Sequence, residues 1–349
     1  MSLPPSEIPL GAMRFNSDSQ KLEYWMGSAW MQIKTFLPNL AESSGISTTS
    51  VSTGARGVWC GGDPSRTTNM DFLTIPSRGN TTDFGDLPFA NAGMNIGIQA
   101  NNTRGFTSGG EAPVGDSHNY IVKYDFATTG SAVDHADLTF TSKNGGGYSN
   151  ATRAIQHRGY GAPSITHDDV CAFTMASSAD SFTFSDIIAD YQYGGGGQAS
   201  PTRGVISIAH SSSNSLEFCT IATTGAFQDF GDMTITKNGN RSGTGGSSTR
   251  GVFMGGGDDS ITTCSFITFA TTGDSNEFGD LSTGKAYSTA VSDRITCMMA
   301  GGQLAPNSSV TNQIDSLSIA TGGEAVDSGD LTVSKREMGA ASNGHGGLG

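Results

Sequence analysis

Short runs of alternating apolar and polar residues follow one another along most of the chain. Residues 264–269 (CSFITF) alternate in this way, residues 294–300 form a mostly apolar run, and residues 276–281 form a third run. Gly, Asn, Asp and Ser stand at the breaks, which is typical of turns between antiparallel strands. No segment keeps a helical period of 3.6 residues for more than a turn or two. The pattern predicts an all-β protein.

A four-residue motif, aromatic-Gly-Asp-apolar or a variant of it, returns along the chain at a nearly constant spacing. Its aspartates lie 51, 49, 46, 48 and 50 residues apart, at Asp86, Asp137, Asp186, Asp232, Asp280 and Asp330. A second motif, an Arg before an apolar strand and often a Gly pair, keeps the same phase at Arg56, Arg104, Arg158, Arg203, Arg250 and Arg294. A repeat of this length that holds four strands has the size of a β-propeller blade.

The repeats predict four-stranded antiparallel blades over residues 35–349. The Gly pair after the second strand, the β-rich third strand and the aromatic residue in the fourth resemble the kelch repeat, with Phe in place of its usual Tyr and Trp. This resemblance covers residues 43–349 and implies a kelch-like β-propeller.

The two ends of the repeat region have the features of two halves of one further blade. Residues 36–40 have the spacing of an outer strand, whereas residues 335–343 resemble a first strand and residues 344–347 a shortened second strand. Joining these halves would leave no exposed sheet edge. We therefore expect seven blades closed by both termini, with six blades as the alternative.

Composition narrows the class of protein. With 19 basic and 32 acidic residues the net charge is −13, and no Lys/Arg cluster is present to neutralise phosphates, so nucleic acid is not an expected partner. No apolar run reaches the roughly 18 to 20 residues of a membrane span, so no membrane insertion is expected.

The cysteine spacing fits neither a disulfide framework nor a zinc site. We expect Cys60, Cys171, Cys219, Cys264 and Cys297 to be small buried residues of a chain folded in a reducing cytoplasm, with Cys60 and Cys297 at equivalent repeat positions.

Residues 11–33 differ in character from the repeats. Two polar turns separate three strand-like runs, which predicts a small β-meander in an N-terminal unit of residues 1–34. Such a sheet has too little core to stand alone, and two of the three Trp residues lie in it. The expected docking or oligomerisation residues are Phe15, Tyr24, Trp25 and Trp30. The alternative is that the meander only covers the bottom of the propeller.

The sequence of this segment, RFNSDSQKLEYWMGSAW at residues 14–30, is similar to a stretch that recurs in bacteriophage tail-fibre and other virion proteins. The repeats, such as TRGVFMGGG at residues 249–257, also resemble those of structural proteins of tailed phages, notably phages of marine cyanobacteria. The resemblance implies a tail or neck fibre or appendage of the virion, assembled in the host cytoplasm and often trimeric. It also implies contact with other virion proteins through the N-terminus.

Catalytic motifs are missing from the sequence. It has no nucleophile elbow, metalloprotease helix, phosphate-binding loop or EF-hand, and its histidines lack metal-ligand spacing. The repeated Asp and Arg residues are expected to be scaffold residues that cap turns or pair with one another. We therefore expect no enzymatic activity, no catalytic residue and no cofactor other than Ca²⁺.

Variable loops after the second strand of each unit form the expected ligand face. Acidic residues gather in them, at Asp63, Glu111, Asp116, Asp168, Asp169, Asp258 and Asp259. These carboxylates favour recognition of a host surface glycan or protein, with Ca²⁺ as a bridging ion; alternatively, they only form solvated turns.

The sequence therefore predicts a non-enzymatic virion structural protein whose propeller is displayed for host-surface recognition or particle decoration. The first alternative is a polysaccharide-degrading propeller enzyme that acts on host glycans. An intracellular kelch-like interaction hub is a further alternative, weakened by the missing Tyr and Trp of that repeat.

Overall fold

The structure is a computed structural model. It describes residues 8–16, 21–32, 55–111, 117–160, 167–191, 195–208, 213–234, 242–257, 261–304 and 309–349. The chain divides into two compact units, Met1–Val51 and Ser52–Gly349; the predicted boundary after residue 34 lies outside the described residues. Within the described ranges, no helix has the length and apolar character needed to cross a bilayer.

The N-terminal unit contains the predicted β-meander. Strands β1 (Met13–Asn16), β2 (Lys21–Trp25) and β3 (Trp30–Gln32) pair antiparallel in chain order. Alternation along each strand places successive side chains on opposite faces of this sheet.

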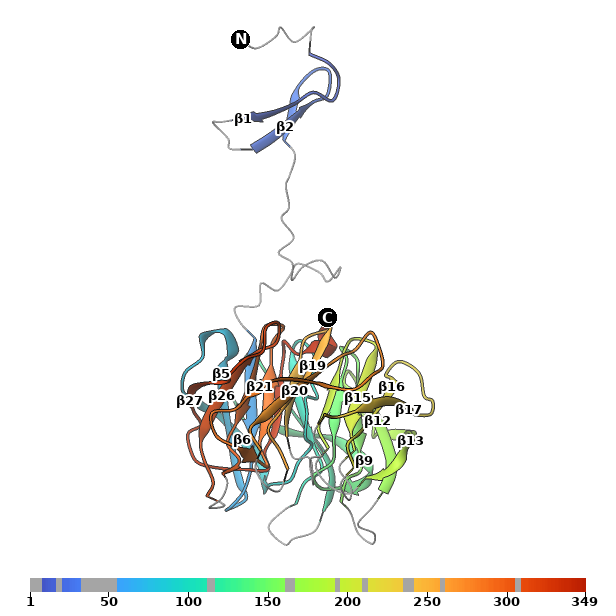
Figure 1. Cartoon of the computed structure of the whole chain (residues 1–349), viewed down its shortest axis with the longest axis vertical. Coiled ribbons are helices and arrows are strands. Elements are labelled where there is room, and N and C mark those ends of the chain that lie inside the picture. The colour runs from blue at the N-terminus through green and yellow to red at the C-terminus, as the bar shows by residue number, and fades with distance from the viewer. Residues whose placement is uncertain are drawn as a thin grey trace. The chain divides into compact units, whose positions relative to one another are not determined.

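The larger unit is all-β, and its sheets are numbered here from 1 to 6 along the chain (Figure 1). Sheet 1 contains β28 (Gly339–Ser342), β4 (Arg56–Cys60), β5 (Thr67–Thr74) and β6 (Thr82–Asn91). Sheet 2 contains β7 (Arg104–Ser108), β8 (His118–Asp125) and β9 (Val133–Ser142). Sheet 3 contains β10 (Gly147–Ser149), β11 (Arg153–His157), β12 (His167–Thr174) and β13 (Phe182–Tyr191).

The remaining sheets repeat this order of strands. Sheet 4 contains β14 (Gly197–Ala199), β15 (Arg203–Ser207), β16 (Ser215–Thr220) and β17 (Gln228–Asp232). Sheet 5 contains β18 (Gly243–Gly246), β19 (Arg250–Met254), β20 (Thr263–Thr268) and β21 (Asn276–Asp280). Sheet 6 contains β23 (Thr289–Ser292), β24 (Thr296–Ala300), β26 (Gln313–Ser318) and β27 (Val326–Asp330), and β22 (Lys285–Ala286) pairs with β25 (Gln303–Leu304) beside it.

The first strands of neighbouring sheets contact one another in sequence. Contacts join β10 to β14, β14 to β18, β18 to β23, β23 to β28, and β28 to β7. Residues 95–100 hydrogen-bond to β7 and form an irregular first strand of sheet 2, since Phe106 N–H donates to Gln99 O at 2.9 Å. This segment also bridges to Gly146 and Ala340 of the sheets on either side. The order of contacts thus returns to its starting point, which is compatible with a β-propeller.

The C-terminal strand completes the first sheet. β28 pairs antiparallel with β4, from Gly339 opposite Cys60 to Ser342 opposite Gly57. The predicted partner, residues 36–40, lies outside the described residues. The prediction of a shortened second strand at residues 344–347 is wrong. Residues Gly346–Leu348 form a 3₁₀ turn (η3), because the His345 side chain accepts a hydrogen bond from Gly347 N–H and caps the turn.

The repeated aromatic-Gly-Asp motif is where neighbouring sheets dock. Gly130, in the turn before β9, donates its N–H to Phe84 O at 2.7 Å, and Gly273 donates to Phe230 O at 2.6 Å. Gly85 has φ +145°, and a Cβ on it would lie 2.5 Å from the Gly130 backbone. The small residue therefore permits close backbone approach and a left-handed φ that other residues rarely adopt.

The repeated arginines also join neighbouring sheets. The strand register shows that Arg153 and Thr296, and not the predicted Arg158 and Arg294, stand in this series. Guanidinium Nη1 atoms donate to main-chain carbonyls of the next sheet in four pairs: Arg56 to Phe126, Arg153 to Ile221, Arg203 to Phe269 and Arg250 to Ile319. The same guanidinium groups lie over aromatic rings, at 4.4 Å in the pair Arg203–Phe218. In these four pairs, carbonyls and rings take the place of the expected carboxylates, whereas Arg104 and Arg158 pair with Asp125 and Asp169 as expected.

The interface between sheets 1 and 2 offers a matched pair of substitutions. Gly85→Ala should lower the free energy of unfolding by about 2–4 kcal/mol, because the new methyl group meets the Gly130 backbone at an unfavourable φ. Gly130→Ala should change it by less than about 0.5 kcal/mol, because a Cβ on Gly130 meets nothing within 4 Å. Urea denaturation measures both values, and equal effects would contradict this account of the motif.

Acid should destabilise the fold through His345. Burial lowers the pKa of this histidine from 6.5 to about 4, and its ring bonds Ala100 O and Gly347 N–H in the neutral form. The unfolded chain therefore binds more protons between pH 6.5 and 4, so stability is full above pH 6.5 and falls by at most about 1.4 kcal/mol per pH unit below it. Urea denaturation from pH 7.5 to 4.5 should show a shallower pH dependence for His345→Gln than for the wild type. An unchanged slope would contradict the prediction.

Candidate functional site

The predicted acidic loops differ in how much of their charge is already paired. Glu111, nearly buried, accepts from Arg66 Nη2 at 2.5 Å and also pairs with Lys143. Asp63 pairs with Arg336 Nη2 at 3.2 Å. These carboxylates serve as links between neighbouring sheets, and their neutralisation makes them poor ligands for a cation.

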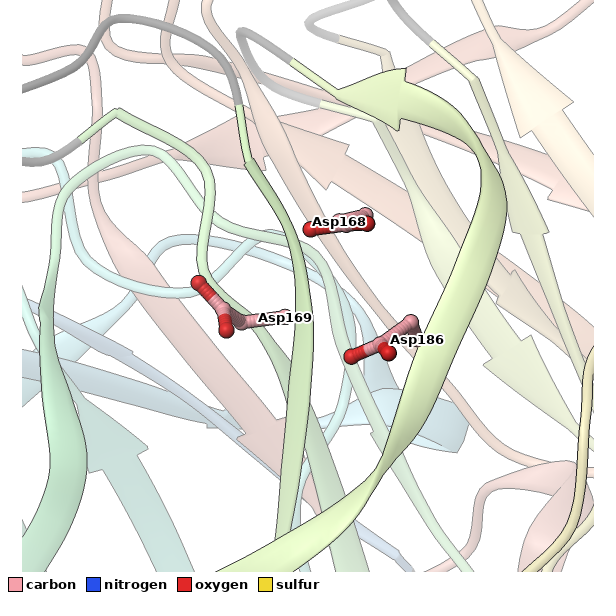
Figure 2. Close-up of side chains that lie close together, drawn as sticks. All are labelled: Asp168, Asp169 and Asp186. Carbon is pink, nitrogen blue, oxygen red and sulfur yellow. The ribbon is translucent and has the colours of Figure 1, made fainter.

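Three aspartates of sheet 3 form the acidic cluster, defined as Asp168, Asp169 and Asp186. One carboxylate oxygen from each lies within 4.8 Å of the others. Figure 2 shows Asp186 extending from β13 toward β12, where the Asp168 and Asp169 side chains lie. Two of these residues are predicted ligand-face residues, and the structure brings them together with a third that the sequence assigned to the scaffold.

The strand register explains this juxtaposition. Asp169 lies directly opposite Asp186 in the antiparallel pair of β12 and β13, with an irregularity in the register beside Asp169. Such a bulge redirects neighbouring side chains. In the equivalent pairs Asp86, Asp232 and Asp280 face Asn69, Ser215 and Thr263, so sheet 3 places a second acid where these sheets place a neutral side chain.

The members of the cluster have different surroundings. Asp168 and Asp186 are exposed. Asp169 accepts from Arg158 Nη1 at 2.8 Å and lies 3.6 Å from His167 Nδ1. Arg158 therefore neutralises one of the three carboxylates and also fixes the position of Asp169.

This donor set fits a hard divalent cation. Ca²⁺ takes oxygen ligands at about 2.3–2.6 Å, so oxygens within 4.8 Å of one another can share one ion. Asp168 and Asp186 would be the primary ligands, and Asp169 would join at the expense of its bond to Arg158. Water would supply the remaining ligands of an ion that normally binds six to eight oxygens.

The other predicted ligand-face residues cannot be placed. Asp116, Asp258 and Asp259 lie outside the described residues. Among the described residues, only the acidic cluster brings three or more carboxylate, His or Cys groups close enough to share an ion. Sequence analysis missed Asp186 as a site residue; the signal that could have revealed it is the acidic pair Asp168-Asp169 in the strand that precedes it.

Two hollows of the larger unit lie among its described residues. One of about 10 Å³ lies where first strands meet, lined by Ile98, Gln198, His345 and neighbouring glycines. Another, of about 230 Å³, lies at the turn between β16 and β17, lined by Phe218, Thr220, Thr223 and Gln228 among others. No carboxylate lines either hollow.

The four predicted docking residues divide between the two faces of the N-terminal sheet. Trp25 is buried and packs against Trp30 with ring centroids 5.3 Å apart, and Arg14 lies over Trp30 and pairs with Glu23. Phe15 and Tyr24 belong to the opposite face. The Trp residues therefore support the sheet, which corrects the expectation that Trp25 is available to a partner.

The opposite face of this sheet is apolar and exposed. We call it the apolar face; its cross-strand pairs align Met13 with Tyr24 and Tyr24 with Met31. Met13 is 67% exposed, Phe15 65% and Met31 45%. Each of the three strands contributes to this surface.

All five cysteines are free and buried, as predicted. Burial raises the pKa of the Cys60 thiol to about 12 and that of Cys171 to about 11, so neither is a ready nucleophile. Cys297 does not occupy the position of Cys60. Cys60 lies opposite Met70, and the residue at the same register position in sheet 6 is Ala300, opposite Ile314.

Comparison with known proteins gives a fold and no family. Neither the known protein families nor the curated proteins include a match to this chain. The solved structure of YjhT matches with a TM-score of 0.58 at 12% sequence identity, over 76% of this chain and 93% of that chain. The likeness shows the fold alone.

Calcium should stabilise the larger unit through the acidic cluster. At ten times its dissociation constant Ca²⁺ adds about 1.4 kcal/mol to the free energy of unfolding, which a thermal-shift titration against Mg²⁺ and chelator controls can detect. Asp186→Asn should abolish this effect. Asp232→Asn removes the repeat aspartate opposite Ser215 in sheet 4 and should leave it intact. Equal calcium responses in both variants would rule out the cluster as the site.

Proposed function

We propose that the chain is a non-enzymatic structural protein of a bacteriophage virion, held by its N-terminal sheet and displaying a β-propeller for host-surface recognition or particle decoration. The observation that carries the proposal is the apolar face. Met13, Phe15 and Met31 are about half to two-thirds exposed on a sheet of three short strands. Such a sheet gains too little from its own core to be stable alone, and a virion partner that covers this face would supply the missing burial.

The propeller is proposed to have six blades. Sheets 1 to 6 supply them, and three observations support a closed ring of this number: the successive contacts of the first strands, the pairing of β28 with β4, and the docking of Gly79 against Ser328. In the last of these, Gly79 N–H of sheet 1 bonds Ser328 O of sheet 6 at 2.7 Å, as Gly130 bonds Phe84 between sheets 1 and 2. Six, the alternative expectation, is thus favoured over seven.

A displayed propeller suits recognition better than catalysis. The two hollows, of about 10 Å³ and about 230 Å³, are smaller than the roughly 300–1,000 Å³ of most small-molecule sites. Asp63 and Glu111 are neutralised by basic partners. The resemblance of residues 14–30 to virion proteins supports the location on a phage particle and contact with other virion proteins.

The polysaccharide-degrading alternative rests on the acidic cluster. Two carboxyl groups about 5–5.5 Å apart are the arrangement of retaining glycosidases, and the cluster brings carboxylate oxygens within 4.8 Å. Incubation with purified host-surface polysaccharide tests it. New reducing ends that disappear in Asp186→Asn would favour the enzyme, whereas binding without product favours adhesion.

Incorporation into particles tests the main proposal. Immunogold labelling of purified phage with antibody to the propeller should mark wild-type particles. The variant Phe15→Ser/Met31→Ser should be lost from particles while remaining folded in the lysate. Ile295→Ser, which removes a side chain 69% exposed on the larger unit, is the matched control and should still be incorporated. Unlabelled wild-type particles would contradict the virion role.

A further inference from the structure

Two lysines of the larger unit are buried at equivalent positions. Lys285 and Lys335 precede the first strands of sheets 6 and 1 and are 0% and 1% exposed. Each reaches a buried aspartate on the third strand of the same sheet: Lys285 Nζ lies 2.6 Å from Asp315 Oδ2, and Lys335 Nζ lies 2.7 Å from Asp71 Oδ2. Charges so deeply buried are rare unless they are paired.

A carboxamide distinguishes the two sites. Lys335 Nζ also donates to Asn69 Oδ1 at 2.7 Å. The register position of Asn69, opposite Asp86, is taken in sheet 6 by Gln313, opposite Asp330. From Gln313, Lys285 Nζ contacts only the main-chain oxygen, at 3.4 Å. The Gln313 side-chain amide instead donates a hydrogen bond to Asp315 Oδ1.

The surroundings of Asp71 hold its carboxylate against the lysine. Thr332 Oγ1 donates to Asp71 Oδ1 at 2.5 Å, which leaves Oδ2 facing Lys335 Nζ. Asp71 is 0% exposed. In this buried setting the two charges lose their hydration, and Oδ2 lies close enough to Lys335 Nζ to exchange a proton with it directly.

A neutral buried amine beside a carboxamide is an activated nucleophile. We propose that Lys335 and Asn69 join in an intramolecular isopeptide bond, with Asp71 as the proton carrier. Lys335 first passes one ammonium proton to Asp71; the amine Nζ then attacks Asn69 Cγ, while the Asp71 carboxylic acid hydrogen-bonds the carbonyl oxygen on which charge develops. The new C–N bond forms, the C–Nδ2 bond breaks, and the proton from the amine passes through Asp71 to the leaving nitrogen. The products are a secondary amide and one ammonia molecule, with no oxidant or reductant.

The bond would join the two ends of the ring. Asn69 lies on β5 and Lys335 lies just before β28, so the link would close a loop spanning a separation of 266 residues in the sequence. Lys285 lacks a side-chain carboxamide contact of this kind and stays an unmodified ion pair. Lys285 is therefore an internal control for Lys335.

Intact-mass spectrometry of the denatured full-length protein tests the bond. The wild type should weigh about 17 Da less than its sequence requires, the mass of the ammonia lost. Lys335→Arg and Asp71→Asn should show no deficit, and Lys285→Arg should keep it. The mass deficit of each variant, corrected for its substitution, is compared with that of the wild type, which cancels any mass change from processing at the termini. Peptide mapping should recover residues 69 and 335 in one cross-linked fragment.

Each other result overturns the proposal. A wild type at its full sequence mass means that the contact is an ordinary ion pair. A deficit of about 18 Da means loss of water, which would make Asp71 the partner in place of Asn69. A 17 Da deficit that survives in Lys335→Arg arises elsewhere in the chain. Gel mobility of the denatured protein gives an independent readout, because a chain closed over this separation is more compact and migrates faster than Lys335→Arg.

Discussion

Close backbone contact between neighbouring sheets is the constraint on which the larger unit depends. The Gly-containing turn before the fourth strand donates an N–H to the Phe-Gly-Asp segment of the preceding sheet, and the second residue of that segment has no room for a side chain. Arginines near the same end of the strands add a charged hydrogen bond to a carbonyl of the next sheet. A four-stranded sheet that could not make these contacts would leave both faces exposed, so the recurrence of the motif follows from the packing rather than from any chemistry of the aspartate.

The sequence was informative where a motif reports on backbone geometry. The spacing of the Phe-Gly-Asp motifs predicted the strands and their order, because each motif contacts the equivalent turn of the next sheet. It was misleading where the motif could be matched by chance. Arg158 precedes a glycine, as Arg56 does, yet Arg153 occupies the structural position, since the register of β11 and β12 depends on pairing across strands. The glycine-rich C-terminal residues were also misinterpreted, as a short strand. The sequence alone did not show that the His345 side chain caps a 3₁₀ turn there.

The acidic cluster shows a different limit of sequence reasoning. Asp168 and Asp169 stood out as loop acids, and Asp186 as a repeat residue, but only the register of β12 against β13 brings the three together. The pairing of Glu111 with Arg66 and Lys143 was equally invisible, since these residues come from three different repeats. The net charge of −13 therefore says little about where negative charge is available on the surface.

The pairing of β28 with β4 has a consequence for how the molecule forms. During synthesis β4, β5 and β6 leave the ribosome long before residues 339–342 exist, and the inner edge of β4 has no partner until then. An unpaired strand edge is a template for association with other chains, and domains otherwise tend to fold as they emerge. Sheet 1 is thus the first sheet to be synthesised and the last to be completed. A chain truncated before β28 would leave the edge of β4 unpaired, which favours aggregation.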